Sequence, residues 1–138
     1  MAIADASTPW ALKVITLSDR LVAELGAREH LEIVADLAMQ AAHDLGCGTL
    51  YGASEVGRRI VEEAAQRGQM EAPIALAKVL LVDGLLITGT NVLAAAERVR
   101  RAGAIGIAVF AALADPDALA AVRIELGTDV IALEVTGS

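Results

Sequence analysis

One short stretch of the chain combines groups that can hold an anion. Asp83 follows an apolar run, and Thr88-Gly89-Thr90-Asn91 leads from it into a helical pattern. A helix N-terminus presents unpaired N–H groups and the positive end of the helix dipole. Thr and Asn side chains add hydrogen-bond donors, and Gly lets the backbone approach a ligand closely. The stretch therefore predicts a phosphate site, although Thr and Asn are also ordinary helix caps.

A second stretch, residues 52–57, has a similar but weaker pattern, with a strand-like run before it and a helical pattern after it. Glu55 would place a carboxylate near a bound anion, where two like charges about 4 Å apart repel by on the order of 4 kcal/mol at an effective dielectric of 20. Arg58 and Arg59 could offset that charge, or they could be plain surface charges on the helix. The members of this second candidate loop are Ala53, Ser54, Glu55, Val56 and Gly57.

The remaining reactive side chains give little sign of a metal site. His30 and His43 fall outside the apolar stripe of their helical segment and have no third ligand at a useful spacing. We expect both to be solvated. Cys47 is the only cysteine, which excludes an internal disulfide, and its place before an apolar run predicts a buried, inert thiol.

The elements around these residues alternate between strand and helix patterns. This alternation predicts an α/β fold with three layers, a parallel sheet flanked by helices and joined by right-handed crossovers. Continuous apolar runs indicate strands buried on both faces. The strand patterns cover residues 49–52, 72–76, 77–84, 104–113 and 129–135. The helical patterns cover residues 28–45, 53–68 and 91–102 and a segment that starts at residue 115.

The helical pattern at residues 28–45 has a period near 3.6, and Gly46 follows its end. We expect its apolar stripe to face the sheet. The stripe comprises Leu31, Val34, Leu37, Ala38, Ala41 and Leu45.

The length, net charge and apolar pattern of the chain favour a single domain without a nucleic-acid or membrane partner. A chain of 138 residues suits a single core. We expect residues 1–28 to form an arm anchored by Trp10 and a short helix capped by Ser18 and Asp19, and residues 29–138 to form the α/β domain. A net charge of −7 opposes binding to a phosphate backbone. The lack of a long uninterrupted apolar run predicts a soluble, cytoplasmic protein. The mean hydropathy of +0.58 favours surface covered by a partner subunit, in a homodimer.

Two segments together resemble type I phosphoribosyltransferases. "VLLVDGLLITGTN", residues 79–91, resembles the ribose-phosphate motif, in which an apolar strand runs into two acids, two apolar residues and a Thr-Gly loop. "LYGASEVGRRIVEEAA", residues 50–65, resembles the pyrophosphate loop and is closest to the orotate and adenine branches. The similar segments span roughly residues 31 to 135, and the resemblance implies a Rossmann-like phosphoribosyltransferase core.

The resemblance implies roles for the two loops. Thr88, Gly89, Thr90 and Asn91 would hold the 5-phosphate of phosphoribosyl pyrophosphate. Asp83 would face the ribose hydroxyls, or would bind Mg²⁺ indirectly through its water shell. Residues 53–57 would lie where pyrophosphate leaves.

Several departures from the family pattern weaken the case for catalysis. Gly84 stands where the family has its second acid, and Ile87 stands where some purine-specific members carry an acid that assists the base. The flexible loop that closes over the sugar and the hood that grips the base have no counterpart in the sequence. Without them the site would not exclude water.

Three functions therefore remain open. The chain could bind a phosphorylated ligand (phosphoribosyl pyrophosphate, ribose 5-phosphate or a nucleotide) with weak turnover or none. It could be a minimal, Mg²⁺-dependent transferase completed by a partner subunit, or an interaction module with a vestigial loop. The sequence assigns no residue a catalytic role.

Overall fold

The computed structural model describes residues 28–69 and 72–136. The arm with Trp10 and the helix capped by Ser18 and Asp19 lie outside these residues, as does most of the predicted N-terminal unit. The elements are α2 (Arg28–Leu45), β1 (Thr49–Gly52), α3 (Glu55–Gln66), β2 (Lys78–Leu86), α4 (Thr90–Arg101), β3 (Gly106–Ala114), α5 (Pro116–Leu126) and β4 (Val130–Val135).

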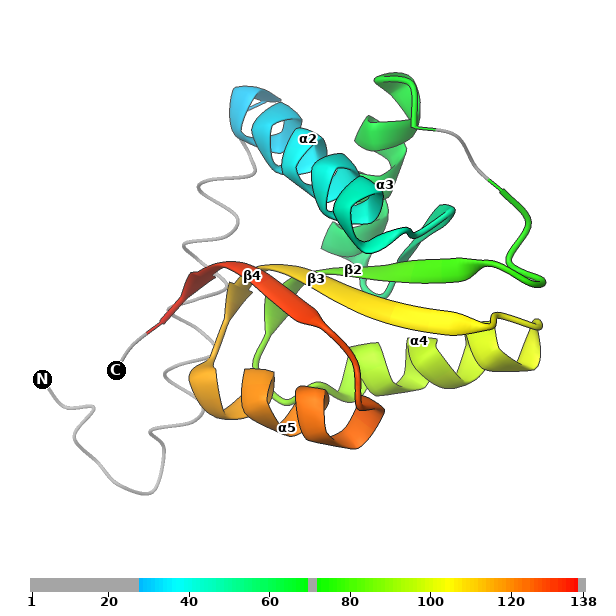
Figure 1. The fold of residues 1–138 in the computed structure, drawn as a ribbon. Coiled ribbons are helices and arrows are strands. Elements are labelled where there is room, and N and C mark those ends of the chain that lie inside the picture. Colours follow the sequence, from blue (N-terminus) through cyan, green and yellow to red (C-terminus); the bar gives the residue numbers. More distant parts are fainter. Residues whose placement is uncertain (1–27, 70–71, 137–138) are drawn as a thin grey trace, which may run out of the picture.

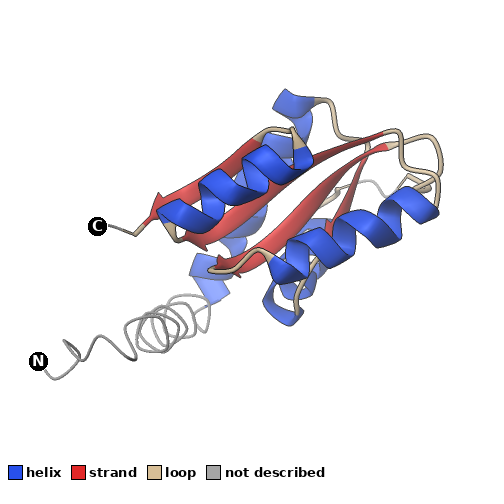
Figure 2. Ribbon diagram, turned by 90° about the horizontal axis from the view of Figure 1, so that it is seen from below, coloured by secondary structure: helices blue, strands red, loops and turns tan. Residues whose placement is uncertain are grey.

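The strands form one parallel sheet in the order β1-β2-β3-β4. Helices α2 and α3 lie on one face of the sheet, and α4 and α5 lie on the other (Figures 1 and 2). The predicted three-layer α/β architecture is therefore confirmed.

Local sequence signals set several helix ends. The Ser54 hydroxyl accepts a hydrogen bond from the Gly57 amide at 3.0 Å and caps α3. Asp115 caps α5, with Pro116 at the first helical position, as the sequence predicted. Gly46 and Gly127 follow α2 and α5 with φ angles of 70° and 60°, which glycine adopts without strain.

The sheet separates two hydrophobic cores. Alternate residues of β2 and β3 point to opposite faces, as strand geometry requires. Leu80, Val82 and Phe110 pack under α2 and α3. Val79, Leu81 and Val109 pack against α4 and α5. All six side chains are fully buried, which confirms that these strands are covered on both faces.

The expectation of uniformly right-handed crossovers is wrong for one connection. The β1-to-β2 and β2-to-β3 steps advance across the sheet in the same direction, yet α3 and α4 lie on opposite faces. The two connections must therefore have opposite hands. Figure 1 shows that α4 and α5 close right-handed turns, so the β1-α3-β2 connection is left-handed. Before β2 begins, the chain is bonded to the turn between α4 and β3: the Leu76 amide donates to the Gly103 carbonyl, and the Ala77 carbonyl accepts from the Ile105 amide.

Two further expectations need correction. Residues 72–76 form no strand but irregular backbone with a bend and a turn, because the Leu76 amide bonds to the Gly103 carbonyl outside the sheet and Leu76 takes a positive φ of 65°. In α2 the predicted stripe is buried at Leu31, Ala38 and Ala41, but Leu37 is 42% exposed. Leu37 lies on the flank of α2, beyond the width of sheet that the helix covers.

None of the helices in the described ranges is long and apolar enough to cross a membrane.

Candidate phosphate-binding site

The first predicted loop forms a pocket at the carboxyl end of β2. The pocket has a volume of about 200 Å³. Ligands of open parallel sheets bind at this edge, outside the carboxyl ends of the strands. The structure thus brings Asp83 and the predicted loop together, and the lining residues are Asp83, Leu85, Ile87, Thr88, Gly89, Thr90 and Asn91.

Gly89 gives the loop its close fit to the rest of the domain. Its φ of 81° lies in the left-handed region, and it is the N-cap residue of α4. A Cβ atom added here would lie 2.7 Å from Cγ2 of Val122 on α5. Only glycine therefore fits this position without strain or displacement of α5.

The N-terminus of α4 has no side-chain cap. The Thr88 and Thr90 hydroxyls lie 3.0 Å apart and are hydrogen-bonded to each other, and the Thr90 amide donates to the Thr88 hydroxyl at 3.3 Å. Asn91 belongs to the first turn of the helix instead of capping it. The N-cap residue Gly89 supplies no side chain, but the Thr88 hydroxyl accepts from the first amide of α4, which is the capping role that the alternative interpretation gave to threonine. The exposed Thr88 and Thr90 also line the pocket.

Asp83 is a carboxylate inside the strand and not at its end. β2 continues to Leu86, so the loop is shorter than the sequence suggested. Asp83 is only 2% exposed, and its Oδ1 atom has no hydrogen-bond partner. Burial raises the pKa of this carboxyl above its usual range, while the Ser54 hydroxyl and the Gly84 and Leu85 amides offset part of that rise.

The second predicted loop is mostly helix. Glu55, Val56 and Gly57 form the first turn of α3, which leaves Ala53 and Ser54 as the connection from β1. Helix α3 begins this early because Gly57 packs directly on β2: an added Cβ atom would lie 2.0 Å from the Val82 carbonyl oxygen. Glu55 is exposed and does not line the pocket.

Ser54 connects the two predicted loops. Its hydroxyl both caps α3 and interacts with Asp83, so the beginning of α3 lies beside the carboxylate of the first loop. The two loops, far apart in the sequence, therefore meet at one edge of the sheet.

The other side chains considered from the sequence stand apart from this site. Cys47 is buried, and burial raises the pKa of its thiol, as expected for an inert cysteine. His30, His43, Arg58 and Arg59 are exposed. Within residues 28–69 and 72–136, no three His, Cys, Asp or Glu side chains form a group that could hold a metal ion.

Sequence reasoning missed Leu85 as a lining residue. Leu85 and Ile87 follow Asp83 at intervals of two, and all three line the pocket. The period of a β-strand could have identified this set, had the strand been extended past Gly84.

Known proteins were compared with the chain by sequence and by structure. No family model matches the chain, and no curated protein matches it in sequence. Among solved structures, UMP synthase of Leishmania donovani matches with a TM-score of 0.68 and 18% identity, over 83% of this chain but only 29% of that chain.

Two single-activity enzymes are also similar in structure. Orotate phosphoribosyltransferase of Mycobacterium tuberculosis, in complex with 5-phospho-α-D-ribosyl 1-diphosphate, has a TM-score of 0.68 and 14% identity over 83% of this chain and 78% of that chain. Adenine phosphoribosyltransferase of Thermoanaerobacter pseudethanolicus has a TM-score of 0.66 and 17% identity over 82% of this chain and 84% of that chain.

These similarities agree with the resemblance seen in the two loop motifs, and they include both the orotate and the adenine branch. The chain therefore has the fold of the type I phosphoribosyltransferases.

Proposed function

We propose that the chain binds the phosphate of a phosphorylated ribose at the pocket formed by Asp83 and the loop from Thr88 to Asn91. The observation that carries this proposal is the N-terminus of α4, which follows the glycine N-cap Gly89 and lies at a pocket lined by the Thr88 and Thr90 hydroxyl groups. Backbone N–H groups, Thr hydroxyls and the helix dipole all favour a doubly charged anion there. Phosphoribosyl pyrophosphate, ribose 5-phosphate and nucleotides share this phosphate, so the proposed role belongs to nucleotide metabolism.

The size of the pocket limits what it can enclose. Its volume of about 200 Å³ is below the roughly 300–1,000 Å³ of typical small-molecule sites. The phosphoryl end of a ligand would be held, while the rest would extend along the edge of the sheet toward Ser54.

Asp83 suits an indirect contact with Mg²⁺. One carboxylate with an unpaired oxygen cannot form a protein cage for the ion, but Mg²⁺ keeps several waters and commonly binds through one or two carboxylates and substrate phosphates. A bound cation would also favour the ionised form of Asp83 and lower the pKa that burial raises.

Binding with little or no turnover agrees best with the residues around the pocket. Thr88, Thr90 and Asn91 are exposed, so the pocket opens to solvent. Transfer of a reactive sugar requires water to be excluded. Gly84 and Ile87 also bring no acid to the site.

Calorimetric titration of the full chain tests this proposal. Phosphoribosyl pyrophosphate with Mg²⁺, ribose 5-phosphate and AMP would be compared in the wild type and in Thr88→Val. The valine keeps the shape of threonine but removes the hydroxyl, so we expect affinity to fall about tenfold or more, in line with about 1.5–3 kcal/mol for a hydrogen bond to a charged group.

The matched control is Thr128→Val, a threonine at the other end of the sheet, which should leave affinity unchanged. No binding of any ligand to the wild type, or equal binding to Thr88→Val, would refute the phosphate site. Release of pyrophosphate that depends on an added nucleobase would instead show that the chain is an active transferase.

A homodimer in the cytoplasm is part of the same proposal. Leu76, Ile105 and Ile124 are 79%, 71% and 83% exposed, which is unusual for large apolar side chains and favours contact with another subunit. Light scattering across a range of protein concentrations measures the mass of the assembly, and a monomer at all concentrations would contradict this prediction.

A further inference from the structure

The sheet is covered unequally on its two faces. Helices α4 and α5 cover one face, whereas α2 and α3 lie over the other face and leave edge strand β4 largely bare (Figure 1). Parallel sheets are normally covered on both faces. An element that covers β4 on the α2 side is therefore missing from the described part of the chain.

The bare strip of β4 carries apolar side chains. Ile131 packs at the edge of the core under α2 and α3, and Leu133 and Val135 follow it on the same face at intervals of two. Leu133 is 39% exposed and Val135 is 45% exposed. The strip thus becomes more exposed toward the carboxyl end of β4.

The flank of α2 beside this strip is also apolar. Asp36 pairs with Arg67 at the end of α3 at 2.6 Å, which fixes the flank of α2 that faces α3. With 3.6 residues per turn, Leu37 lies about 100° around α2 from Asp36, at the margin of the buried face of the helix, and Ile33 lies about 60° from Asp36, nearer the outer surface. Leu37 is 42% exposed and Ile33 is 54% exposed.

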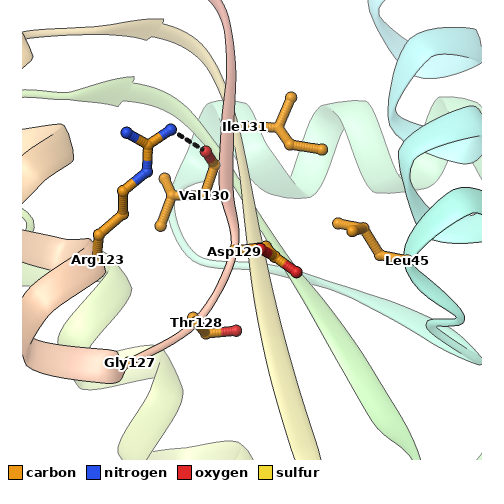
Figure 3. A pocket seen from close by; sticks show the side chains of 7 residues that line it. All are labelled: Leu45, Arg123, Gly127, Thr128, Asp129, Val130 and Ile131. Carbon is orange, nitrogen blue, oxygen red and sulfur yellow. Dashed lines mark hydrogen bonds between the residues drawn. The ribbon is translucent and has the colours of Figure 1, made fainter.

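A cavity of about 720 Å³ lies between the last residue of α2, Leu45, and the start of β4. Figure 3 shows Asp129 and Ile131 on the side of β4 that faces Leu45, with Arg123 on the other side, where it donates a hydrogen bond to the Val130 carbonyl. We name the whole surface the α2–β4 groove, formed by Leu37, Leu45, Ile131, Leu133 and Val135, with Ile33 at its outer rim.

We propose that residues 1–27 of the same chain occupy the α2–β4 groove. The segment ends directly before Arg28, where α2 begins, so it enters at the end of the groove marked by Ile33. α2 has 18 residues, which is about 27 Å at 1.5 Å per residue. Trp10 precedes Arg28 by the same number of positions, so even a fully helical segment brings Trp10 to the cavity beside Leu45.

The chemistry of the segment matches the groove. Leu21 and Leu25 are four positions apart and would lie on one face of the short helix capped by Ser18 and Asp19, while Val14 and Leu17 add apolar side chains to the arm before it. The cavity at the far end combines the apolar Leu45 and Ile131 with the carboxylate of Asp129. A Trp side chain suits such a cavity, because it has a large apolar body and one N–H donor.

Trp10 is the only tryptophan in the chain, so its fluorescence reports directly on the proposal. In the full-length wild type we expect blue-shifted emission and weak quenching by acrylamide. The variant Leu37→Glu/Leu133→Glu places two charges in the groove at partly exposed positions. We expect it to shift emission to the red and to raise the quenching constant several-fold.

The control is Ala121→Glu, an exposed position on α5 at the other face, which should leave emission unchanged. Circular dichroism checks that each variant keeps its secondary structure. Full solvent exposure of Trp10 in the wild type, or the same shielding in the groove variant, would overturn the proposal.

A second copy of the chain is the competing occupant. If shielding of Trp10 disappears on dilution together with dissociation of a dimer, the groove is an interface between copies and the proposal fails. Shielding that is independent of concentration supports the intramolecular arrangement. Neither outcome depends on phosphate binding, so this test stands apart from the calorimetric one.

Discussion

At the scale of single residues, Asp83 is the most informative position. It is a buried carboxylate with one unpaired oxygen, and burial raises its pKa. Such a group lowers stability in the ionised form, so its presence needs another explanation. Perturbed carboxylates of this kind gather at functional sites, and Asp83 lines the same pocket as the threonine loop.

Asp83→Asn should make the free protein more stable at neutral pH. Below the usual pKa of 3.8, the carboxyl is protonated in both the folded and the unfolded states and does not lower the free energy of unfolding. As the pH rises above this value the unfolded state ionises first, and the penalty grows until the pH passes the raised pKa of the folded state. Each tenfold change in the ionisation constant corresponds to about 1.4 kcal/mol. Urea denaturation of both proteins across this pH range measures the difference.

Asp36→Asn is the opposite control. The Arg67 guanidinium holds the pKa of the exposed Asp36 carboxyl below its usual range, so its loss should slightly lower stability at neutral pH. An Asp83→Asn variant that is less stable than the wild type at neutral pH would mean that the carboxylate has a folding role that burial does not reveal.

At the scale of elements, glycines set the distance between helices and the sheet at the site. Gly57 brings α3 onto the backbone of β2 beside Val82, and Gly89 brings the start of α4 against Val122 of α5. These two contacts place both helix N-termini at the carboxyl edge of the sheet, where Asp83 and Ser54 meet. Close packing is what converts two separate loops into one site.

Gly57→Ala should destabilise the fold, because the added methyl group would collide with the backbone of β2 and force α3 or β2 to move. The new Cβ atom would lie 2.0 Å from the Val82 carbonyl oxygen. Overpacking of this kind costs about 1–3 kcal/mol or more. Gly48→Ala is the matched control, since its nearest neighbour would be 3.9 Å away. Thermal denaturation of both variants tests the difference, and equal melting temperatures would refute the close contact.

At the scale of the whole molecule, small aliphatic side chains build both cores, and the single Phe of the sequence lies at the centre of one of them. The side chain of Phe110, on β3, is fully buried beneath α2 and α3. Few other large side chains are present to fill a gap there. This core should therefore be sensitive to the loss of one ring.

Phe110→Ala should lower the free energy of unfolding by about 3–5 kcal/mol, a large part of the roughly 5–15 kcal/mol typical of a domain. Ile124→Ala, at an exposed position, should change it by about 0.5 kcal/mol or less. Chemical denaturation of the two variants gives both values, and a loss at Phe110 as small as that at Ile124 would show that the core closes around the cavity.

The layered fold and the composition of the main loop could both be predicted from the sequence alone. Alternating apolar runs and helix caps are local signals, so β1, α5 and the loop from Thr88 to Asn91 could be placed without tertiary information. The confirmed burial of Cys47 has the same origin, because an apolar run follows it directly.

Only the tertiary structure decided how these parts meet. Three features depend on contacts between segments that are distant in sequence: the hand of the β1-α3-β2 connection, the exposure of Leu37 and the close contact of Gly57 with β2. The unpaired Oδ1 of Asp83 is also invisible in the sequence. The physical reason is that hydrophobic periodicity states which side of an element avoids water, while the neighbour that covers this side is selected by packing across the whole domain.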